Sequence, residues 1–351
     1  MHMADALISP LVGGVMWGVT AAVTACSARK IKAGTDDGVV PLMGVLGAFI
    51  FAAQMINFSI PGTGSSGHLG GGMILSILLG PHAAFLTMAS VLTVQALFFA
   101  DGGLLALGCN IFNLAFLPCF VAYPLIYRTI VGAHASEKRV RVASIIAAVV
   151  GLQLGALAVV LETFFSGVSE LPFTTFLLLM LPIHLAIGIV EGLLTAAVVT
   201  CVGKARPGVL ATSAAPPLAP QPGSSRLLAR WLLLAAITGG LLSWFASTRL
   251  DGLEWAIFHS SGREALSAPA TDAHSLAAAL QERTAVLPDY SLPPAADRSD
   301  AGEVAATGGE EEKQWPDVNL ATSFSGLLGA TLSMLLAGLL GFILLRLRQR
   351  P

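Results

Sequence analysis

Residues 142–165 read VASIIAAVVGLQLGALAVVLETFF and contain one charged side chain, Glu162. A helix needs about 20 mainly apolar residues to cross the hydrocarbon core of a membrane, so this stretch predicts a membrane-spanning helix. The stretch 69–80 is too short to cross alone and ends at the turn Gly80-Pro81, so we predict a short or re-entrant helix there. Comparable long apolar stretches predict further spans over 7–28, 39–58, 83–100, 104–127, 173–202, 227–246 and 320–345. The chain is therefore expected to place nine helices in the membrane.

The composition of the whole chain agrees with a membrane protein. Of its 351 residues, 55% are hydrophobic and 11% are charged, with a mean hydropathy of +0.77, whereas soluble domains carry about 25% charged residues. The expected fold class is all-α, a polytopic bundle of about seven helices followed by two C-terminal transmembrane helices. A formal charge of −2 argues against a nucleic-acid partner. The first apolar stretch is too long for a cleavable signal peptide and lacks its basic start.

The positions of lysine and arginine predict the orientation of the spans. Most of them cluster at helix ends, at 29–32, 128–141, 204–230 and 346–350. With alternate crossings, all four clusters fall on one side, which the positive-inside rule makes cytoplasmic. The N-terminus is then expected outside and the C-terminus in the cytoplasm.

The stretch 204–225 is rich in proline, alanine and serine and is interpreted as a cytoplasmic linker. It separates a membrane domain, 1–203, from a C-terminal part, 226–351. The C-terminal part is expected to contain two transmembrane helices joined by a large extracytoplasmic loop, 247–319.

The outer loop 247–319 has a polar, alanine-rich and acidic tail at 265–313, to which we assign no regular structure. Its acidity could gather cations weakly, although ordinary solvation is the simpler interpretation. His259 and His274 in this loop are candidates for a transient metal contact.

The first two residues, Met1 and His2, directly precede a predicted span. A histidine in second position can use the terminal amine, its own backbone nitrogen and its imidazole Nδ1 to close two fused chelate rings on one ion. Three nitrogens in one plane suit Ni²⁺ or Cu²⁺, and one more imidazole would complete a square. The alternative is that the residue after Met1 is arbitrary.

A second histidine, His68, lies in the glycine-rich loop SIPGTGSSGHLGGG at 59–72. Glycines let the backbone of such a loop approach another segment closely. In the predicted topology this loop faces outward, as does His2. Alone, His68 would be interpreted as a solvated loop residue, but together with His2 it predicts a metal site.

Several other polar residues lie in or beside the predicted spans. Gln95 and Asn113 are expected to make interhelical hydrogen bonds, and His82 to be structural. Asp101 and Asn110 are expected to face the bundle interior or a transport pathway, as such residues usually do.

His184 and Glu191 lie seven residues apart on one face of the span 173–202. A carboxylate inside a membrane is costly, so either a functional role or a His184–Glu191 pair that locks helices fits the pattern. Their depth on this helix is expected to leave them poorly placed to meet Met1.

A rival function is a membrane-embedded hydrolase that uses His184 and Glu191 with Ser65 or Ser66 as nucleophile. The serines are predicted at the outer edge, far from the two other groups, so the proximity that nucleophilic catalysis needs is missing. The chain also lacks a GxxxxGK[ST] phosphate loop and is not expected to hydrolyse ATP.

Four motifs resemble the CbiM/NikM family, the substrate-binding components of energy-coupling-factor importers for cobalt and nickel. The resemblance extends over about 1–203. The part after the linker is similar to the small NikN/CbiN-type partner, through DGLEWAIF at 251–258 and LPDYSLP at 287–293. The four motifs are MHMADALIS at 1–9, GTGSSGHLGGG at 62–72, the stretch LLGPHAAFLTMASVLTVQALFFADGGLLALGCNIFN at 78–113 and LPIHLAIGIVEGLLTAAVV at 181–199.

The resemblance implies a function and a site. The metal ligands would be Met1, His2 and His68, and the transported ion would be Ni²⁺, or alternatively Co²⁺ for cobalamin synthesis. The implied partners are a transmembrane coupling protein and two ATPase subunits in the bacterial cytoplasmic membrane. The C-terminal part would assist uptake without forming the site, and its outer loop is expected to touch the loop 59–72.

Overall fold

A computed structural model describes residues 2–34, 38–133, 136–205, 224–263, 266–292 and 316–348. Nearly all of the regular structure is helical. The long and short helices are α1 (Pro10–Gly34), α2 (Val39–Gln54), α3 (Gly72–Leu79), α4 (Pro81–Phe99), α5 (Leu107–Ile111), η2 (Phe112–Tyr127), α6 (Arg128–Val131), α7 (Glu137–Ser166), α8 (Phe173–Ala205), α9 (Ser224–Gly240), α10 (Gly252–Ser261), α11 (Asp272–Thr284) and α12 (Leu320–Arg348). Three short 3-10 helices are η1 (Asp5–Leu7), η4 (Leu242–Phe245) and η5 (Pro288–Tyr290), and two strands, β1 (Phe58–Ser59) and β2 (Ser66–Gly67), form a small antiparallel hairpin.

The expected all-α membrane bundle is confirmed. Within the described ranges, six helices are long and apolar enough to cross a membrane, and two shorter apolar helices cover 39–54 and 228–240. The stretch 69–80 contains the short helix α3, which ends at Gly80. Hydropathy located these elements well because only helices satisfy the backbone hydrogen bonds of an apolar span.

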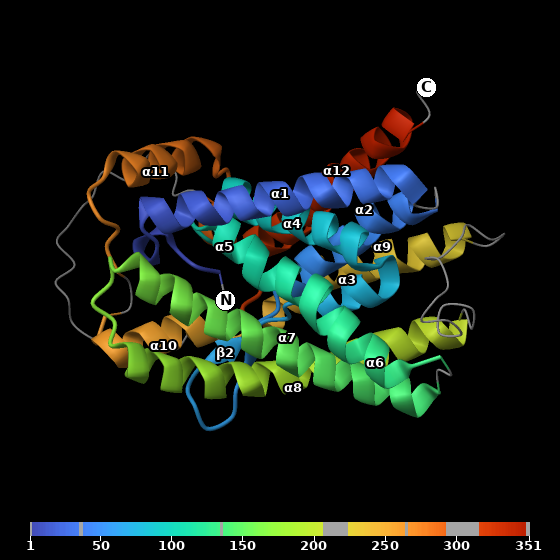
Figure 1. Cartoon of the computed structure of the whole chain (residues 1–351), viewed down its shortest axis with the longest axis horizontal. Helices are drawn as coiled ribbons and strands as arrows, with labels where there is room; N and C mark the ends of the chain where they lie inside the picture. Colours follow the sequence, from blue (N-terminus) through green and yellow to red (C-terminus); the bar gives the residue numbers. More distant parts are fainter. Residues whose placement is uncertain are drawn as a thin grey trace.

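The helices run side by side along the long axis of the molecule (Figure 1). Helix α7 packs along α8 and η2, while α2 packs against α12 and α9. The crossing of α9 and α12 is close because two glycines meet there: a Cβ on Gly326 would lie 2.3 Å from the carbonyl oxygen of Gly239. The C-terminal helices therefore pack into the bundle beside α2.

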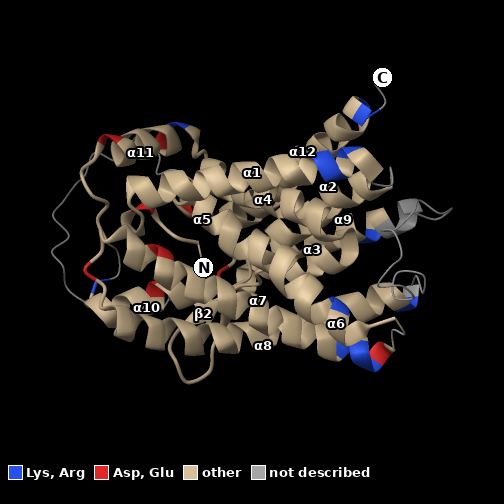
Figure 2. Cartoon of the chain, in the orientation of Figure 1, with Lys and Arg blue, Asp and Glu red and all other residues tan. Residues whose placement is uncertain are grey.

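Charged residues separate toward the two ends of the bundle (Figure 2). Lys and Arg gather at the end that contains α6, the start of α9 and the end of α12, while the acidic residues in view lie mainly at the end with α10 and α11. Along the helices between these ends, large apolar side chains face outward, including Leu11 at 78%, Leu193 at 55% and Leu339 at 56% exposure. Such exposed leucines are expected where lipid is the neighbour.

The outer loop of the C-terminal part is more ordered than the sequence suggested. Helix α10 begins with a capping box, in which Asp251 accepts from the Glu254 amide and Glu254 accepts from the Asp251 amide. Helix α11 forms at 272–284, where Thr271 caps its first turn. The expectation of no regular structure across 265–313 was therefore wrong for α11, while residues 293–315 lie outside the described part.

Candidate metal site

The N-terminal segment turns back into the bundle, and side chains and backbone from the 101–110 region hold it there. The backbone nitrogen of Met3 donates to Asn110 Oδ1 at 2.8 Å, and Asn110 Nδ2 donates to the Met3 carbonyl at 3.2 Å. The Gly103 amide donates to the same carbonyl at 2.9 Å. Met3 is fully buried, so the position of His2 beside it is set by three hydrogen bonds.

The imidazole of His2 is paired with Asp101. Nδ1 donates to Asp101 Oδ1 across 3.0 Å, and the histidine side chain is only 8% exposed. The second nitrogen, Nε2, is buried and has no hydrogen-bond partner among the described residues. Nδ1, the atom that the terminal chelate would use, is thus occupied, and the chelate requires the ring to turn away from Asp101.

Asp101 is a strong acceptor because it stays ionised. Burial by itself would raise its pKa, but the charge and hydrogen bond of His2 and the hydrogen bond from Tyr290 outweigh burial and hold the pKa below its usual value. Asp101 was expected to face an interior or a pathway, and here it faces the histidine of the predicted site.

His68 lies directly after β2, and the hairpin brings it against His2. The two imidazole rings stack with centroids 5.1 Å apart and planes 6° from parallel. Burial, and after it nearby positive charge, lowers the pKa of His68 to about 3. The ring is therefore neutral near pH 7, which is the form that binds metals. The structure thus brings two of the three predicted ligands together, while Met1 lies outside the described residues.

Glu191 anchors the glycine loop that carries His68. Its two carboxylate oxygens accept from the amides of Gly70 and Gly71, each at 3.0 Å. A Cβ on Gly70 would lie 2.7 Å from a Glu191 oxygen, so glycine is needed for this approach. Glu191 is 4% exposed, and its partners are loop amides rather than His184. The suggested His184–Glu191 pair is therefore not formed.

The C-terminal part also contacts the His68 loop, as expected for the outer loop. The Ser66 amide donates to the Leu250 carbonyl at 2.8 Å, and the Ser66 hydroxyl donates to the Arg249 carbonyl, also at 2.8 Å. Ser247 donates from its amide to the Asn57 carbonyl at 2.7 Å. These bonds occupy the Ser66 hydroxyl that the rival hydrolase would have used.

Two further residues of the C-terminal part hold Asp101 and the N-terminal segment. The Tyr290 hydroxyl donates to Asp101 Oδ2, on the side of the carboxylate opposite His2. His274 Nε2 lies 3.2 Å from the Asp5 carbonyl and 3.0 Å from the Ile8 carbonyl, and its Nδ1 lies 2.7 Å from the Thr271 hydroxyl. Both nitrogens of His274 are thus used in structural contacts, so its suggested transient metal contact is not supported.

The remaining polar residues take the roles that the sequence suggested. Gln95 donates to Gln54 at 2.9 Å, and Asn113 donates to Glu162 at 2.8 Å, so both make interhelical hydrogen bonds. His82 Nδ1 lies 3.2 Å from the Ser27 hydroxyl, in keeping with a structural role.

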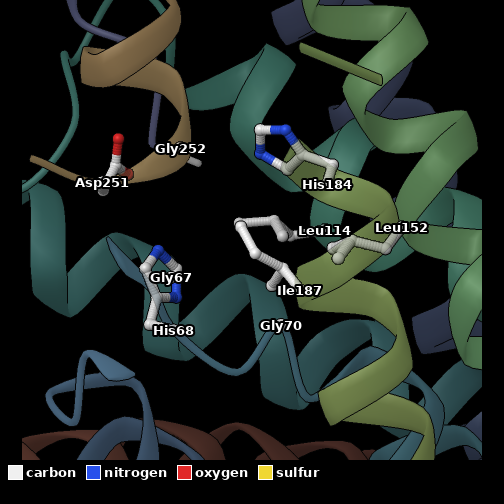
Figure 3. A pocket seen from close by; sticks show the side chains of 9 residues that line it. All are labelled: Gly67, His68, Gly70, Leu114, Leu152, His184, Ile187, Asp251 and Gly252. Carbon is white, nitrogen blue, oxygen red and sulfur yellow. The ribbon is translucent and has the colours of Figure 1, made fainter. Parts of the chain in front are cut away.

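A small cavity of about 10 Å³ lies between the His68 loop, α8 and the start of α10 (Figure 3). His68, His184 and Asp251 line it from these three elements. His184 thus faces the same cavity as His68. Its expected poor placement to meet Met1 stays a prediction, because Met1 lies outside the described residues. Within the described part of the chain, no three His, Cys, Asp or Glu side chains form a ready-made metal cluster.

Sequence reasoning missed two residues around the site, Asp251 and Tyr290. For Glu191 it offered a functional role or a pair with His184, and it missed the anchoring of the glycine loop. Asp251 belongs to the motif DGLEWAIF and Tyr290 to the motif LPDYSLP. The polar residues in these two motifs were the features of the sequence that could have indicated a role at the site. Their distance along the chain from His2 gave no indication of contact.

Comparison with known proteins identifies relatives of both parts of the chain. Residues 2–209 match a family model described as the cobalt uptake substrate-specific transmembrane region, and residues 225–346 match the PDGLE domain. A protein of Haloquadratum walsbyi, named for metal transport, is 39% identical over 212 residues, which are 60% of this chain and 94% of that protein. The fused nickel transport protein NikMN of Rhodobacter capsulatus is 31% identical over 228 residues, 62% of this chain and 65% of that protein.

A solved structure has the same fold over more than half of the chain. The crystal structure of a truncated transition metal transporter is 32% identical and superposes with a TM-score of 0.52. The match covers 58% of this chain and 99% of that one. Similarity in sequence and in fold therefore points to the same kind of protein.

Proposed function

Because this chain belongs to the family of substrate-specific transmembrane regions for cobalt uptake, we propose that it captures one Ni²⁺ ion at the outer face of the membrane for import. It is a nickel or cobalt transport component of the CbiM/NikM type. Co²⁺ is the alternative cargo, because the same nitrogen ligands suit both ions. No hydrolase role is proposed, since its relatives are transport proteins.

One observation supports the capture site most directly: the stacked pair His2 and His68, 5.1 Å apart. We propose that the terminal amine of Met1, the backbone nitrogen and Nδ1 of His2, and a nitrogen of His68 bind the ion. To do so, Nδ1 of His2 must exchange Asp101 for the metal. The backbone nitrogen must lose its proton to bind the ion, so the affinity for the ion falls as the pH is lowered.

The surrounding contacts prepare this site before the ion arrives. Asn110 holds the backbone at Met3, and Glu191 holds the loop after His68. A rigid support of this kind keeps ligands near their binding geometry. The parts of the loop on either side of His68, residues 65–67 and 69–72, are buried and limit the access of water to the ligands.

The charge distribution supports inward transport. Lys and Arg gather at the end of the bundle opposite α10 and α11 (Figure 2), and the positive-inside rule makes that end cytoplasmic. The N-terminus and the site then face outward. Release inward would be driven by a transmembrane coupling protein and two ATPase subunits, because this chain has no phosphate loop of its own.

Direct metal binding tests the proposal. The full chain is purified with a C-terminal tag and an unmodified N-terminus, and Ni²⁺ and Co²⁺ are titrated by calorimetry. One ion per chain is expected, with Ni²⁺ bound more tightly. A folded protein that binds neither ion would contradict the proposed capture role. The dependence of import on separate ATPase subunits is tested by Ni²⁺ uptake in cells. Cells that express this chain with the ATPase subunits should take up Ni²⁺, and cells without those subunits should not.

A further inference from the structure

His184 has a ring nitrogen that the structure leaves without a partner. The residue is 1% exposed, and its Nε2 has no hydrogen-bond partner among the described residues. Its Nδ1 lies 2.8 Å from the Met180 carbonyl oxygen, which can only accept. Nδ1 therefore carries the proton and the lone pair lies on Nε2. Buried polar atoms are almost always satisfied, so this lone pair is a candidate to bind a ligand.

The ring edge that contains Nε2 faces the cavity shared with His68 and Asp251 (Figure 3). The cavity volume is about 10 Å³, roughly one water-sized sphere, which also suits one bare metal ion. Gly252 keeps this space open, since a Cβ there would lie 3.2 Å from His184 Cε1. A larger organic ligand does not fit.

Three of the nine residues that line the cavity, His68, His184 and Asp251, carry groups that can bind a divalent transition metal. Imidazole nitrogens and a carboxylate are suitable ligands for Ni²⁺ and Co²⁺. An imidazole whose other N–H donates to a backbone carbonyl is the usual arrangement of a metal-binding histidine, because that bond fixes the tautomer. The Met180 carbonyl supplies this bond for His184.

We propose that Nε2 of His184 is a further ligand of the transported ion, bound from the same cavity as His68. This inference rests on the proposed function and adds a ligand from a membrane helix to a site otherwise built from the N-terminus and a loop. His68, His184 and Asp251 do not form a ready-made cluster in the metal-free protein, so binding draws at least one of them inward. The ion then contacts α8 directly, four residues from the Gly188 position where α8 packs on α7.

The variant His184→Leu tests the proposal because leucine fills the same space without a nitrogen. The change removes the unpartnered Nε2 and also the bond from Nδ1 to the Met180 carbonyl. These two effects oppose each other, so the melting temperature of the metal-free protein should change little. Affinity for Ni²⁺ should fall about 10–100-fold, a range found even for the loss of an outer-shell partner. The visible absorption bands of bound Co²⁺, which report the number of ligands, should shift.

Thr195→Val is the matched control. Thr195 lies on the same helix and is also buried with an unpartnered oxygen, but it does not line the cavity. It should change neither affinity nor the Co²⁺ spectrum. His184→Gln, which keeps a polar side chain, is the second variant if the leucine variant folds poorly.

The outcomes separate this inference from the proposed function. If the wild-type chain binds no ion, the proposed function fails. If the wild type binds but His184→Leu retains its affinity and Co²⁺ spectrum, the cavity holds only water and the inference alone is overturned. If both His184 variants melt at a lower temperature without metal, and this loss of stability accounts for their weaker binding, His184 has a structural role. That result would also overturn the inference that His184 is a ligand.

Discussion

Nδ1 of His2 and Oδ1 of Asp101 lie 3.0 Å apart, so the nitrogen needed for the terminal chelate is already bonded in the metal-free protein. Asp101 therefore competes with the ion for His2. Replacing Asp101 by asparagine converts a charge-assisted hydrogen bond into a neutral one of about half the strength. Asp101→Asn is expected to speed Ni²⁺ association about fivefold, measured by stopped-flow mixing. Slower association would indicate that Asp101 positions His2 for the metal instead.

The terminal amine can be tested without altering any side chain. One alanine inserted between Met1 and His2 moves the imidazole out of the fused chelate rings and should abolish tight Ni²⁺ binding in calorimetry. An N-terminal tag should act similarly, while the same tag at the C-terminus should not. The size of His2 disfavours removal of Met1, which mass spectrometry verifies. Undiminished affinity in the inserted variant would rule out the terminal chelate.

His68 is expected to be the fourth ligand. His68→Ala should weaken Ni²⁺ binding at least tenfold and abolish uptake, because it removes the neutral imidazole stacked on His2. His82→Ala is the control, since His82 contacts Ser27 away from the site. His134, which lies outside the described residues, gives a second control as His134→Ala. Equal uptake by all three variants would show that the fourth ligand is elsewhere.

Glu191 should act on the ion only through the loop that it anchors. Glu191→Gln keeps the shape but replaces one accepting oxygen by a donor that faces a loop amide, so about 1–3 kcal/mol of anchoring is lost. We expect Ni²⁺ affinity to fall about tenfold. Glu162→Gln is the control, because Glu162 is a buried carboxylate whose described partner is Asn113 rather than the loop. Equal losses in both variants would indicate a general effect on bundle stability.

The contribution of the C-terminal part can be measured by dividing the chain in the linker. The fragment 1–215 contains all three N-terminal ligands and should bind Ni²⁺, but more weakly than the full chain. It lacks His274 and Tyr290, which hold the N-terminal segment and Asp101. Co-expression with 216–351 should restore uptake. A folded, inserted fragment without any binding would move the site into the C-terminal part.

Much of the fold could be predicted from the sequence, because an apolar solvent leaves few choices. A stretch such as 142–165 must form a helix to satisfy its own backbone, and α7 covers it. Helix α11 was missed because its surface is polar, and its position depends on tertiary contacts such as His274 with the Asp5 carbonyl.

The sequence singled out His2 and His68, which the structure brings together as a stacked pair, and their metal-binding role stays a prediction. Their neighbours Asp251 and Tyr290 could not be predicted. His2 and His68 are informative because of local context, a terminus and a glycine loop. Asp251 and Tyr290 gain their roles only when segments almost 200 residues apart meet, as in the bond from Tyr290 to Asp101. Such contacts leave no pattern in a single sequence.

The bonds from His274 to the carbonyls of Asp5 and Ile8 have a consequence for biogenesis. A chain is synthesised from its N-terminus, and early parts usually fold first. Here the bonds that His274 makes to the N-terminal segment can form only after α11 has been made, 266 residues after Ile8 and 269 residues after Asp5. The N-terminal segment is therefore secured late in synthesis, and a prematurely terminated chain would lack these contacts.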